Sequence, residues 1–173
     1  KKLGWTLDDA AGECLDKVGR LLGLGYPAGA LVEQLAHTGN AQRFEFPLPM
    51  TASRDFNMSF SGIKTHSRRH ITELEQAGEL NAVTIADFCA SLQQGVFRHI
   101  LHKLGKLLEQ TTVKELWLGG GVAANTMLKT RLRQVARQHT LTFRTPYSHK
   151  LCGDNAAMIG VAGSYHFTEG SLH

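Results

Sequence analysis

The chain has 173 residues, of which 42% are hydrophobic and 20% are charged, which is the size and composition of one globular domain rather than of a disordered segment. No run of about 18 apolar residues occurs, which excludes a membrane-spanning helix, and the three cysteines form no CxxC pair, so we expect reduced thiols in a cytosol-like compartment. The formal net charge is only +4, but it is unevenly distributed along the chain.

A helix is the first predicted element. Thr6 is placed to cap it, with Asp8 and Asp9 in the first turn, where carboxylates favour the positive end of the helix dipole. The glycine-rich segment 23–29 breaks this helix. A short second helix follows, and its inward-facing residues are Leu31, Val32 and Leu35.

The middle of the chain has little regular pattern until one long helix begins. Residues 39–62 are expected to be irregular or extended, and a polar stretch over residues 73–81 precedes the long helix. That helix is predicted to run roughly from Thr84 to Glu109. Its apolar stripe consists of Ile85, Phe88, Leu92, Val96, Ile100, Leu104 and Leu107.

The last third of the chain alternates strands with helices. Residues 113–118 have the pattern of a buried strand, three glycines end it, and a helix starts near Ala124 or Asn125. A second strand over residues 141–144 leads to a final helix of small residues over 156–165. This alternation indicates an α/β architecture.

The three glycines, residues 119–121, are one candidate binding element. A strand that runs into glycines and then a helix leaves backbone amides uncovered, and these amides suit an anionic or nucleotide group. Asn125 in the first helical turn is placed both to cap the helix and to hydrogen-bond a ribose or base. A tight turn into a helix explains the same glycines, and neither a GxGxxG fingerprint nor a P-loop is present.

Asp154, at the start of the final predicted helix, is a second candidate. One interpretation is a helix cap, a position that aspartate favours. The other is a hard oxygen ligand for a cation.

A basic stretch precedes Asp154. No acidic residue lies between Glu115 and Asp154, and such a segment attracts polyanions such as RNA, although a solvated helix face would look the same. Its basic residues are Lys129, Arg131, Arg133, Arg137, Arg144 and Lys150. Lys129, Arg133 and Arg137 fall on one stripe of the predicted helix.

Two histidine pairs, His66 with His70 and His99 with His102, lie at helical spacing. The glutamate of the HExxH zinc motif is absent, so exposed basic helix surface explains the first pair better than a metal site does. No serine lies in a GxSxG elbow, and no catalytic side chain is identified.

Five blocks of the sequence, in order, resemble the TsaD family, once labelled O-sialoglycoprotein endopeptidases or glycoproteases. The blocks are LDDAAGECLDK (7–17), LGLGYPAG (22–29), SFSGIKT (59–65), GGVAAN (120–125) and CGDNAAMI (152–159). The resemblance covers essentially the whole chain. It implies that residues 1–173 form the carboxyl-terminal, nucleotide-binding lobe of a two-lobe actin/Hsp70/sugar-kinase (ASKHA) fold.

The resemblance also implies an activity. Family members transfer a threonylcarbamoyl group from threonylcarbamoyl-AMP to N6 of the adenosine beside the anticodon, in tRNAs that read codons beginning with A. It implies that Asp16, Gly29 and Asn125 contact the adenylate, where Gly120 and Gly121 complete the pocket, and that Asp154 ligates one divalent metal, iron or zinc. The other ligands in the family are two histidines of an HxxxH motif in the first lobe. The tRNA would meet the stripe of Lys129, Arg133 and Arg137.

With half of that metal site absent, we expect residues 1–173 alone to be inactive. Expected partners are TsaB and TsaE for a bacterial protein acting in the cytoplasm, or a second copy of the chain for a mitochondrial one. The sequence departs from the family pattern in three places. These are Asn57-Met58 before Ser59, Ala28 before Gly29, and Gly153 before Asp154.

Three other functions remain open from the sequence. A HypF-type carbamoyltransferase lobe shares the fold and the GGV-x-x-N block but lacks the SFSGIKT block. The second is a non-catalytic scaffold, and the retention of Asp16, Asn125 and Asp154 speaks against it. The old protease label has the least support, because neither a nucleophile nor HExxH is present.

Overall fold

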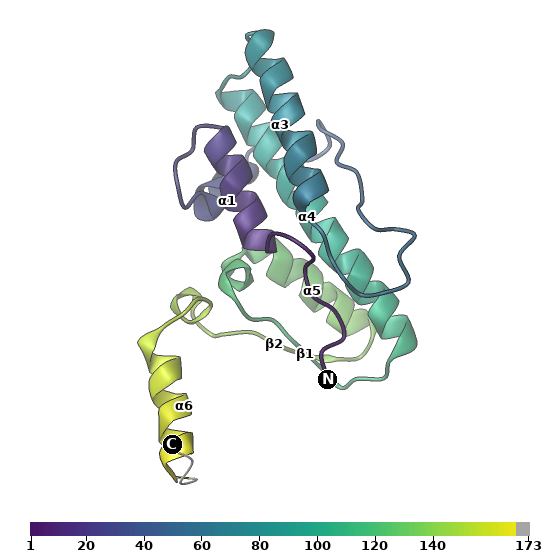
Figure 1. Ribbon diagram of the computed structural model, residues 1–173, viewed down its shortest axis with the longest axis vertical. Coiled ribbons are helices and arrows are strands. Elements are labelled where there is room, and N and C mark those ends of the chain that lie inside the picture. Colours follow the sequence, from purple (N-terminus) through teal and green to yellow (C-terminus); the bar gives the residue numbers. More distant parts are fainter. Residues whose placement is uncertain (169–173) are drawn as a thin grey trace. The chain divides into compact units, whose positions relative to one another are not determined.

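The computed structural model describes residues 1–168 and divides the chain into two compact units. The first comprises residues 1–112, and the second begins at Val113. Figure 1 shows the helices and strands of both units along the chain. Each unit is described separately below.

The first unit is helical throughout its regular structure. Its helices are α1 (Ala11–Leu21), α2 (Gly29–Ala36), α3 (Ser61–Gln76) and α4 (Ala82–Gln110). The 29-residue α4 contacts each of the other three, and Figure 1 shows α3 lying along it. The long α4 is therefore the element around which the unit is built.

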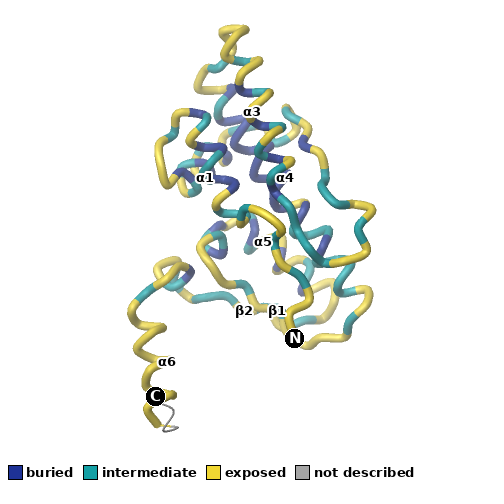
Figure 2. The backbone as a smooth tube through the Cα atoms, in the orientation of Figure 1, coloured by how far each residue is buried: buried dark blue, intermediate teal, exposed yellow. Residues whose placement is uncertain are grey.

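The core of this unit lies where the apolar stripe of α4 meets the other helices. Phe88, Leu92 and Val96 of α4 are fully buried, as are Phe60 and Ile63 at the start of α3. Each such side chain contributes about 1.5–3 kcal/mol of transfer free energy on burial. Figure 2 shows the buried positions gathered on α4 and on the helices that face it.

The start of α4 has a side-chain cap, because the Asn81 carboxamide oxygen accepts a hydrogen bond from the Thr84 amide at 3.0 Å. The prediction of a long helix over 84–109 is confirmed to within two residues at its start and one at its end. The short helix α2 is confirmed as well, with Val32 buried and Leu31 and Leu35 partly buried.

The predicted start of the first helix was wrong. Helix α1 begins at Ala11, and Thr6 lies in a turn, where its hydroxyl donates to the Asp9 carbonyl at 2.7 Å. Thr6 also forms a parallel bridge with Met58. Asp8 does not lie in α1 either, because its carboxylate binds the start of α3, a contact that local sequence does not encode.

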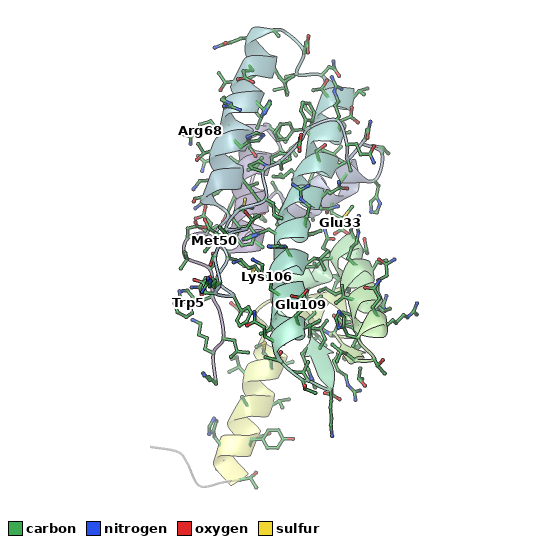
Figure 3. All side chains as sticks on the ribbon, turned by 90° about the vertical axis from the view of Figure 1, so that its right-hand side faces the viewer. Trp5, Glu33, Met50, Arg68, Lys106 and Glu109 are labelled. Atoms are coloured by element: carbon green, nitrogen blue, oxygen red, sulfur yellow. The ribbon has the colours of Figure 1, made fainter. Side chains whose placement is uncertain are left out.

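The bounds of helix α3 were not predicted: residues 61–62 were expected to be irregular and residues 73–76 to be part of a polar stretch, and only the segment 66–70 between them was interpreted as helix surface. Just three of its side chains, Ile63, Ser67 and Ile71, are buried, so its apolar stripe is too sparse to be distinctive in the sequence. Two lysines of α4 bind the loop before α3. Lys103 donates to the Asp55 carbonyl at 3.1 Å. Lys106, labelled in Figure 3, donates to the Thr51 carbonyl at 2.7 Å.

The second unit, described as far as residue 168, combines helices with a small parallel sheet. Its elements are β1 (Glu115–Trp117), the 3-10 turn η1 (Gly121–Ala124), α5 (Thr126–Gln138), β2 (Thr142–Arg144), the 3-10 turn η2 (His149–Leu151) and α6 (Ala156–Thr168). Helix α5 forms the crossover between the two strands and contacts β2. The predicted α/β class is confirmed at this level.

The pairing register sets which side chains share a face of the sheet. Leu116 pairs with Phe143, and both are partly buried, whereas the neighbouring pair of Trp117 and Arg144 is exposed. The prediction of a buried strand was therefore wrong for β1. Successive side chains of a strand point to opposite faces, and only alternate ones are sheltered here.

Helix α6 has no buried residue in the described part of the chain, and Figure 2 shows it exposed along its length. Its first turn is capped by Asn155, whose side-chain oxygen accepts from the Met158 amide at 3.0 Å. None of the described helices combines the length and the apolar character needed to cross a bilayer.

Candidate functional site

Asp16 and Gly29 lie together in the first unit. Asp16 projects from α1, and its Oδ1 accepts hydrogen bonds from the amides of Gly29 at 2.7 Å and Ala28 at 2.9 Å. A carboxylate from a neighbouring helix thus caps α2, where the dipole favours a negative charge. Oδ2 of Asp16 has no hydrogen-bond partner among the described residues, so this oxygen remains available to a ligand.

The small residue at position 29 is what allows this close approach. A Cβ added at Gly29 would lie 3.3 Å from the Asp16 carboxylate. The replacement of the preceding family glycine by Ala28 is accommodated, since Ala28 is fully buried and still donates its amide to Asp16. The departure at position 28 therefore leaves the contact with Asp16 intact.

A second cluster joins the first and third sequence blocks. Asp8 accepts from the Phe60 amide at 2.7 Å through Oδ1 and from the Ser59 hydroxyl at 2.5 Å through Oδ2. Burial acts to raise the pKa of the Asp8 carboxyl, but the hydrogen bonds from Ser59, Phe60 and Ser61 outweigh it and hold the pKa below its usual value. Asp8 is therefore ionised at neutral pH and anchors the start of α3.

Asp9 extends this cluster with two ion pairs. Its carboxylate lies 2.6 Å from the Lys17 ammonium and 2.9 Å from that of Lys64. Hydrogen bonds from these two lysines lower the pKa of Asp9. Lys64 belongs to the SFSGIKT block, so Asp8 and Asp9 both connect that block to the start of α1.

His99 supports the same loop from α4. Its Nε2 accepts a hydrogen bond from the Ser59 amide at 3.2 Å, and its ring meets Phe60 edge-on at a centroid distance of 5.4 Å. Burial lowers the pKa of His99 to about 4, so the imidazole is neutral at pH 7. A neutral ring is required here, because only an unprotonated nitrogen accepts from an amide.

None of Asp8, Ser59, Lys64 and His99 was identified from the sequence as a site residue. A usable signal existed for the first three, because they lie in the blocks shared with the TsaD family. Their pairing spans 51 residues between Asp8 and Ser59, and no local pattern predicts a contact at that separation.

The glycine segment of the second unit leaves open space around its backbone. A Cβ added at Gly119, Gly120 or Gly121 would meet no atom within 4 Å. Gly120 has φ of +87°, which side chains of L-residues rarely adopt, so a glycine is required there. The amides of Gly119 and Gly120 donate no hydrogen bond within the described part of the chain.

Asn125 lies next to these glycines and caps α5. Its side-chain oxygen accepts from the Leu128 amide at 3.0 Å, and the residue is 5% exposed. The predicted capping role is confirmed. The same unit thus brings Gly120, Gly121 and Asn125 together at the start of one helix.

Asp154 does not cap α6, which corrects one of its two interpretations. Asn155 provides the cap, and the exposed Asp154 carboxylate makes no hydrogen bond or ion pair with any described residue. No group of three or more His, Cys, Asp or Glu side chains that could hold a metal occurs among the described residues. As a donor, Asp154 is a free hard oxygen that fits a metal ion as one ligand of several.

Three of the four paired histidines, His66, His70 and His99, have partners within the described residues. His66 contacts the Glu45 carbonyl oxygen at 2.9 Å, and the ring of His70 lies 4.4 Å from that of His66. Burial lowers the pKa of both His66 and His102. The rejection of the HExxH interpretation is consistent with these contacts.

The basic stripe of α5 is only partly as predicted. Arg133 and Arg137 are exposed, whereas Lys129 is partly buried. The Arg133 guanidinium lies over the ring of Phe143 at 5.6 Å. Arg144 of β2, which the stripe did not include, forms an ion pair with Glu115 at 3.2 Å.

Comparison with known proteins identifies the family. Residues 1–161 match the family model described as TsaD, tRNA N6-adenosine threonylcarbamoyltransferase. A protein of this name from Thermosipho melanesiensis is 42% identical over 161 residues, which cover 93% of this chain and 47% of that protein.

Two further relatives with the same name give the same result. The Geotalea uraniireducens protein is 40% identical, and the match covers 99% of this chain and 49% of that protein. The Bdellovibrio bacteriovorus protein is 42% identical, and the match covers 98% of this chain and 48% of that protein. The chain spans about half the length of the curated relatives it matches. As the sequence blocks predicted, the chain belongs to the TsaD family of tRNA N6-adenosine threonylcarbamoyltransferases.

Proposed function

We propose that this chain is the carboxyl-terminal, nucleotide-binding lobe of an enzyme with the ASKHA fold. The enzyme transfers a threonylcarbamoyl group from threonylcarbamoyl-AMP to tRNAs that read ANN codons. The acceptor is N6 of the adenosine 3′ of the anticodon. The observation that carries this proposal is the geometry at Asp16. One of its oxygens is held by two amides of α2, and the other has no partner among the described residues. A carboxylate fixed in this way is a rigid acceptor for a ribose hydroxyl.

The proposed adenylate contacts have distinct roles. Asp16 accepts from the ribose, and Gly29 keeps the start of α2 narrow enough for the sugar to approach. Gly120 and Gly121 present backbone amides to anionic or polar groups, and Asn125 contributes its carboxamide at the first turn of α5. Since the adenylate is a mixed anhydride, these contacts hold its AMP portion while the acyl group is transferred.

Asp154 supplies one carboxylate to a divalent metal, iron or zinc. No group of three or more candidate metal ligands occurs among the described residues. The free carboxylate and the separate cap at Asn155 support this assignment, because the fold of α6 does not use Asp154. A bound divalent cation supplies Lewis-acid polarisation of phosphate or carbonyl oxygens and a template for the substrate. With one ligand present, residues 1–173 alone should transfer no threonylcarbamoyl group.

The tRNA is proposed to approach the second unit, where Lys129, Arg133 and Arg137 provide positive charge along α5. The proposed partners are TsaB and TsaE in a bacterial cytoplasm, or a second copy of the chain in a mitochondrial matrix.

Direct measurement of transfer tests the proposal. The protein with its native flanking sequence is incubated with threonylcarbamoyl-AMP and an ANN-reading tRNA, and N6-threonylcarbamoyladenosine is quantified by mass spectrometry of the nucleosides. We expect product from the wild type, little from Asp16→Ala, and wild-type levels from Glu109→Gln, which removes an exposed carboxylate of α4 (Figure 3). Absence of product from the wild type, or transfer of an unsubstituted carbamoyl group instead, would overturn it.

A further inference from the structure

The positive charge of the chain belongs to its second unit. Residues 1–112 contain 12 lysines and arginines and 12 aspartates and glutamates, so that unit is neutral. Residues 113–168 contain seven basic and only two acidic residues. A polyanion is therefore attracted to the second unit rather than to the chain as a whole.

Within that unit, arginines surround a cavity of about 460 Å³ between α5 and β2. Arg133 and Arg137 line it from α5, together with Phe143 of β2. Arg144 follows Phe143 along β2, so its side chain points to the opposite face of the sheet, where it pairs with Glu115. The guanidinium groups on the α5 side are therefore those of Arg133 and Arg137.

The guanidinium groups of Arg133 and Arg137 have no counter-ion among the described residues. Neither Arg133 nor Arg137 forms an ion pair with a carboxylate in the part of the chain that the structure describes. Arg133 instead lies over Phe143, which fixes the orientation of its planar group. Only Arg144 is paired, with Glu115 at 3.2 Å. Like charges around a shared cavity repel one another, and an anion in the cavity would remove that cost.

We propose that this cavity binds a phosphate of the RNA backbone, so that Arg133 and Arg137 position the tRNA away from the reacting groups. The inference rests on the proposed function for the identity of the RNA. The planar guanidinium matches a phosphate with two parallel hydrogen bonds, which a lysine does not. Lys129 does not line the cavity, so the phosphate-binding set is Arg133 and Arg137.

RNA fits this surface better than a small anion or an acidic protein does. Two further positive charges of the unit, Lys129 and Lys150, lie outside the cavity lining and act only on a ligand that extends beyond it. A backbone of regularly spaced phosphates gains from those charges as well, whereas a single phosphate gains from the two α5 arginines alone. Backbone contacts of this kind set the position of an RNA without reading its sequence.

The test is tRNA binding at several salt concentrations by the protein with its native flanking sequence. Arg137→Ala is compared with Arg131→Ala, which removes the same charge from the same helix outside the cavity. The slope of log affinity against log salt should fall by about 1 for each phosphate that a variant no longer neutralises. We expect part of that change for Arg137→Ala, the full change of about 1 for Arg133→Ala with Arg137→Ala, which removes the one phosphate contact, and little change for Arg131→Ala. The KM for tRNA should rise in the double variant with kcat unchanged.

Three outcomes would overturn the proposal. The slopes for Arg137→Ala and Arg131→Ala could coincide, millimolar inorganic phosphate could displace the tRNA fully, or a polyglutamate peptide could bind in its place with the same arginine dependence. Circular dichroism of each variant shows whether the fold is kept, and Arg137→Lys, which retains the charge, should recover the slope but only part of the affinity.

The two proposals can fail separately. A wild-type protein that makes no N6-threonylcarbamoyladenosine but binds tRNA with the arginine-dependent slope would contradict the proposed function and support the phosphate site. A protein that modifies tRNA with a KM unaffected by the double variant would contradict the phosphate site alone.

Discussion

Asp16→Ala should destabilise the first unit by about 3 kcal/mol. The substitution removes both hydrogen bonds to Oδ1, at 2.7 and 2.9 Å, and leaves the amides of Ala28 and Gly29 without an acceptor. Losing a helix cap costs about 1–2 kcal/mol. Because Ala28 is fully buried, its unpaired amide adds about 1–3 kcal/mol.

Asp16→Asn separates the structural role of this residue from its proposed role in binding. The carboxamide retains one acceptor oxygen for the two amides, so the loss of stability should be about 1 kcal/mol, mainly from the missing charge at the start of α2. The same change replaces the free carboxylate oxygen with a neutral amide group. Affinity for a non-hydrolysable adenylate analogue should therefore fall about tenfold, equivalent to about 1.4 kcal/mol.

Urea unfolding followed by circular dichroism gives the stabilities, and calorimetric titration gives the affinities. The capping argument would be refuted if Asp16→Ala unfolded within about 0.5 kcal/mol of the wild type, the range of neutral surface changes. Loss of stability in Asp16→Asn equal to that in Asp16→Ala would show that the charge, and not the acceptor, holds α2.

Three further predictions concern other elements. The pKa of His99 is lowered to about 4 in the folded protein, against about 6.5 in the unfolded chain. The contribution of the neutral ring to stability is therefore complete above pH 6.5 and is lost as the pH falls toward 4. Urea unfolding should show a loss of about 3 kcal/mol over that range. Gly120→Ala should cost about 1–3 kcal/mol because of the positive φ, whereas Gly119→Ala should be nearly neutral in the same assay. Asp154→Asn should leave thermal unfolding unchanged but lower the iron or zinc content measured by mass spectrometry in the protein with its native flanking sequence.

Each of these predictions has a contradicting result. His99→Gln should flatten the pH dependence of the free energy of unfolding between pH 4 and 6.5. An unchanged dependence in that variant would show that other groups cause it. Equal losses for the two glycine variants would remove the argument from φ. A full metal content in Asp154→Asn would show that this carboxylate is not a ligand.

The sequence predicted the elements whose pattern is strong and local. The seven apolar positions over 85–107 predicted α4, and the strand–glycine–helix order predicted the crossover through α5. Asn125 was placed correctly as a cap, because capping depends on a contact three residues away. The family blocks selected Asp16 and Gly29, which the structure joins directly.

Contacts between distant segments were not predictable from one sequence. Asp8 looked like a residue of the first helical turn, yet its carboxylate binds residues 51 and 52 positions later in the chain. Asp154 looked like a cap until Asn155 was found in that role. The ion pair of Arg144 with Glu115 joins residues 29 positions apart and depends on the pairing of β1 with β2.

The short parallel sheet has a consequence for handling the protein. Each of its two strands pairs on one side only within the described residues, so the outer edges of β1 and β2 lack a strand partner there. Such edges are templates for pairing with other chains, and parallel sheets are normally covered on both faces. Concentrated solutions of residues 1–173 should therefore associate through added strands, and charged substitutions at the exposed Trp117 would suppress that association.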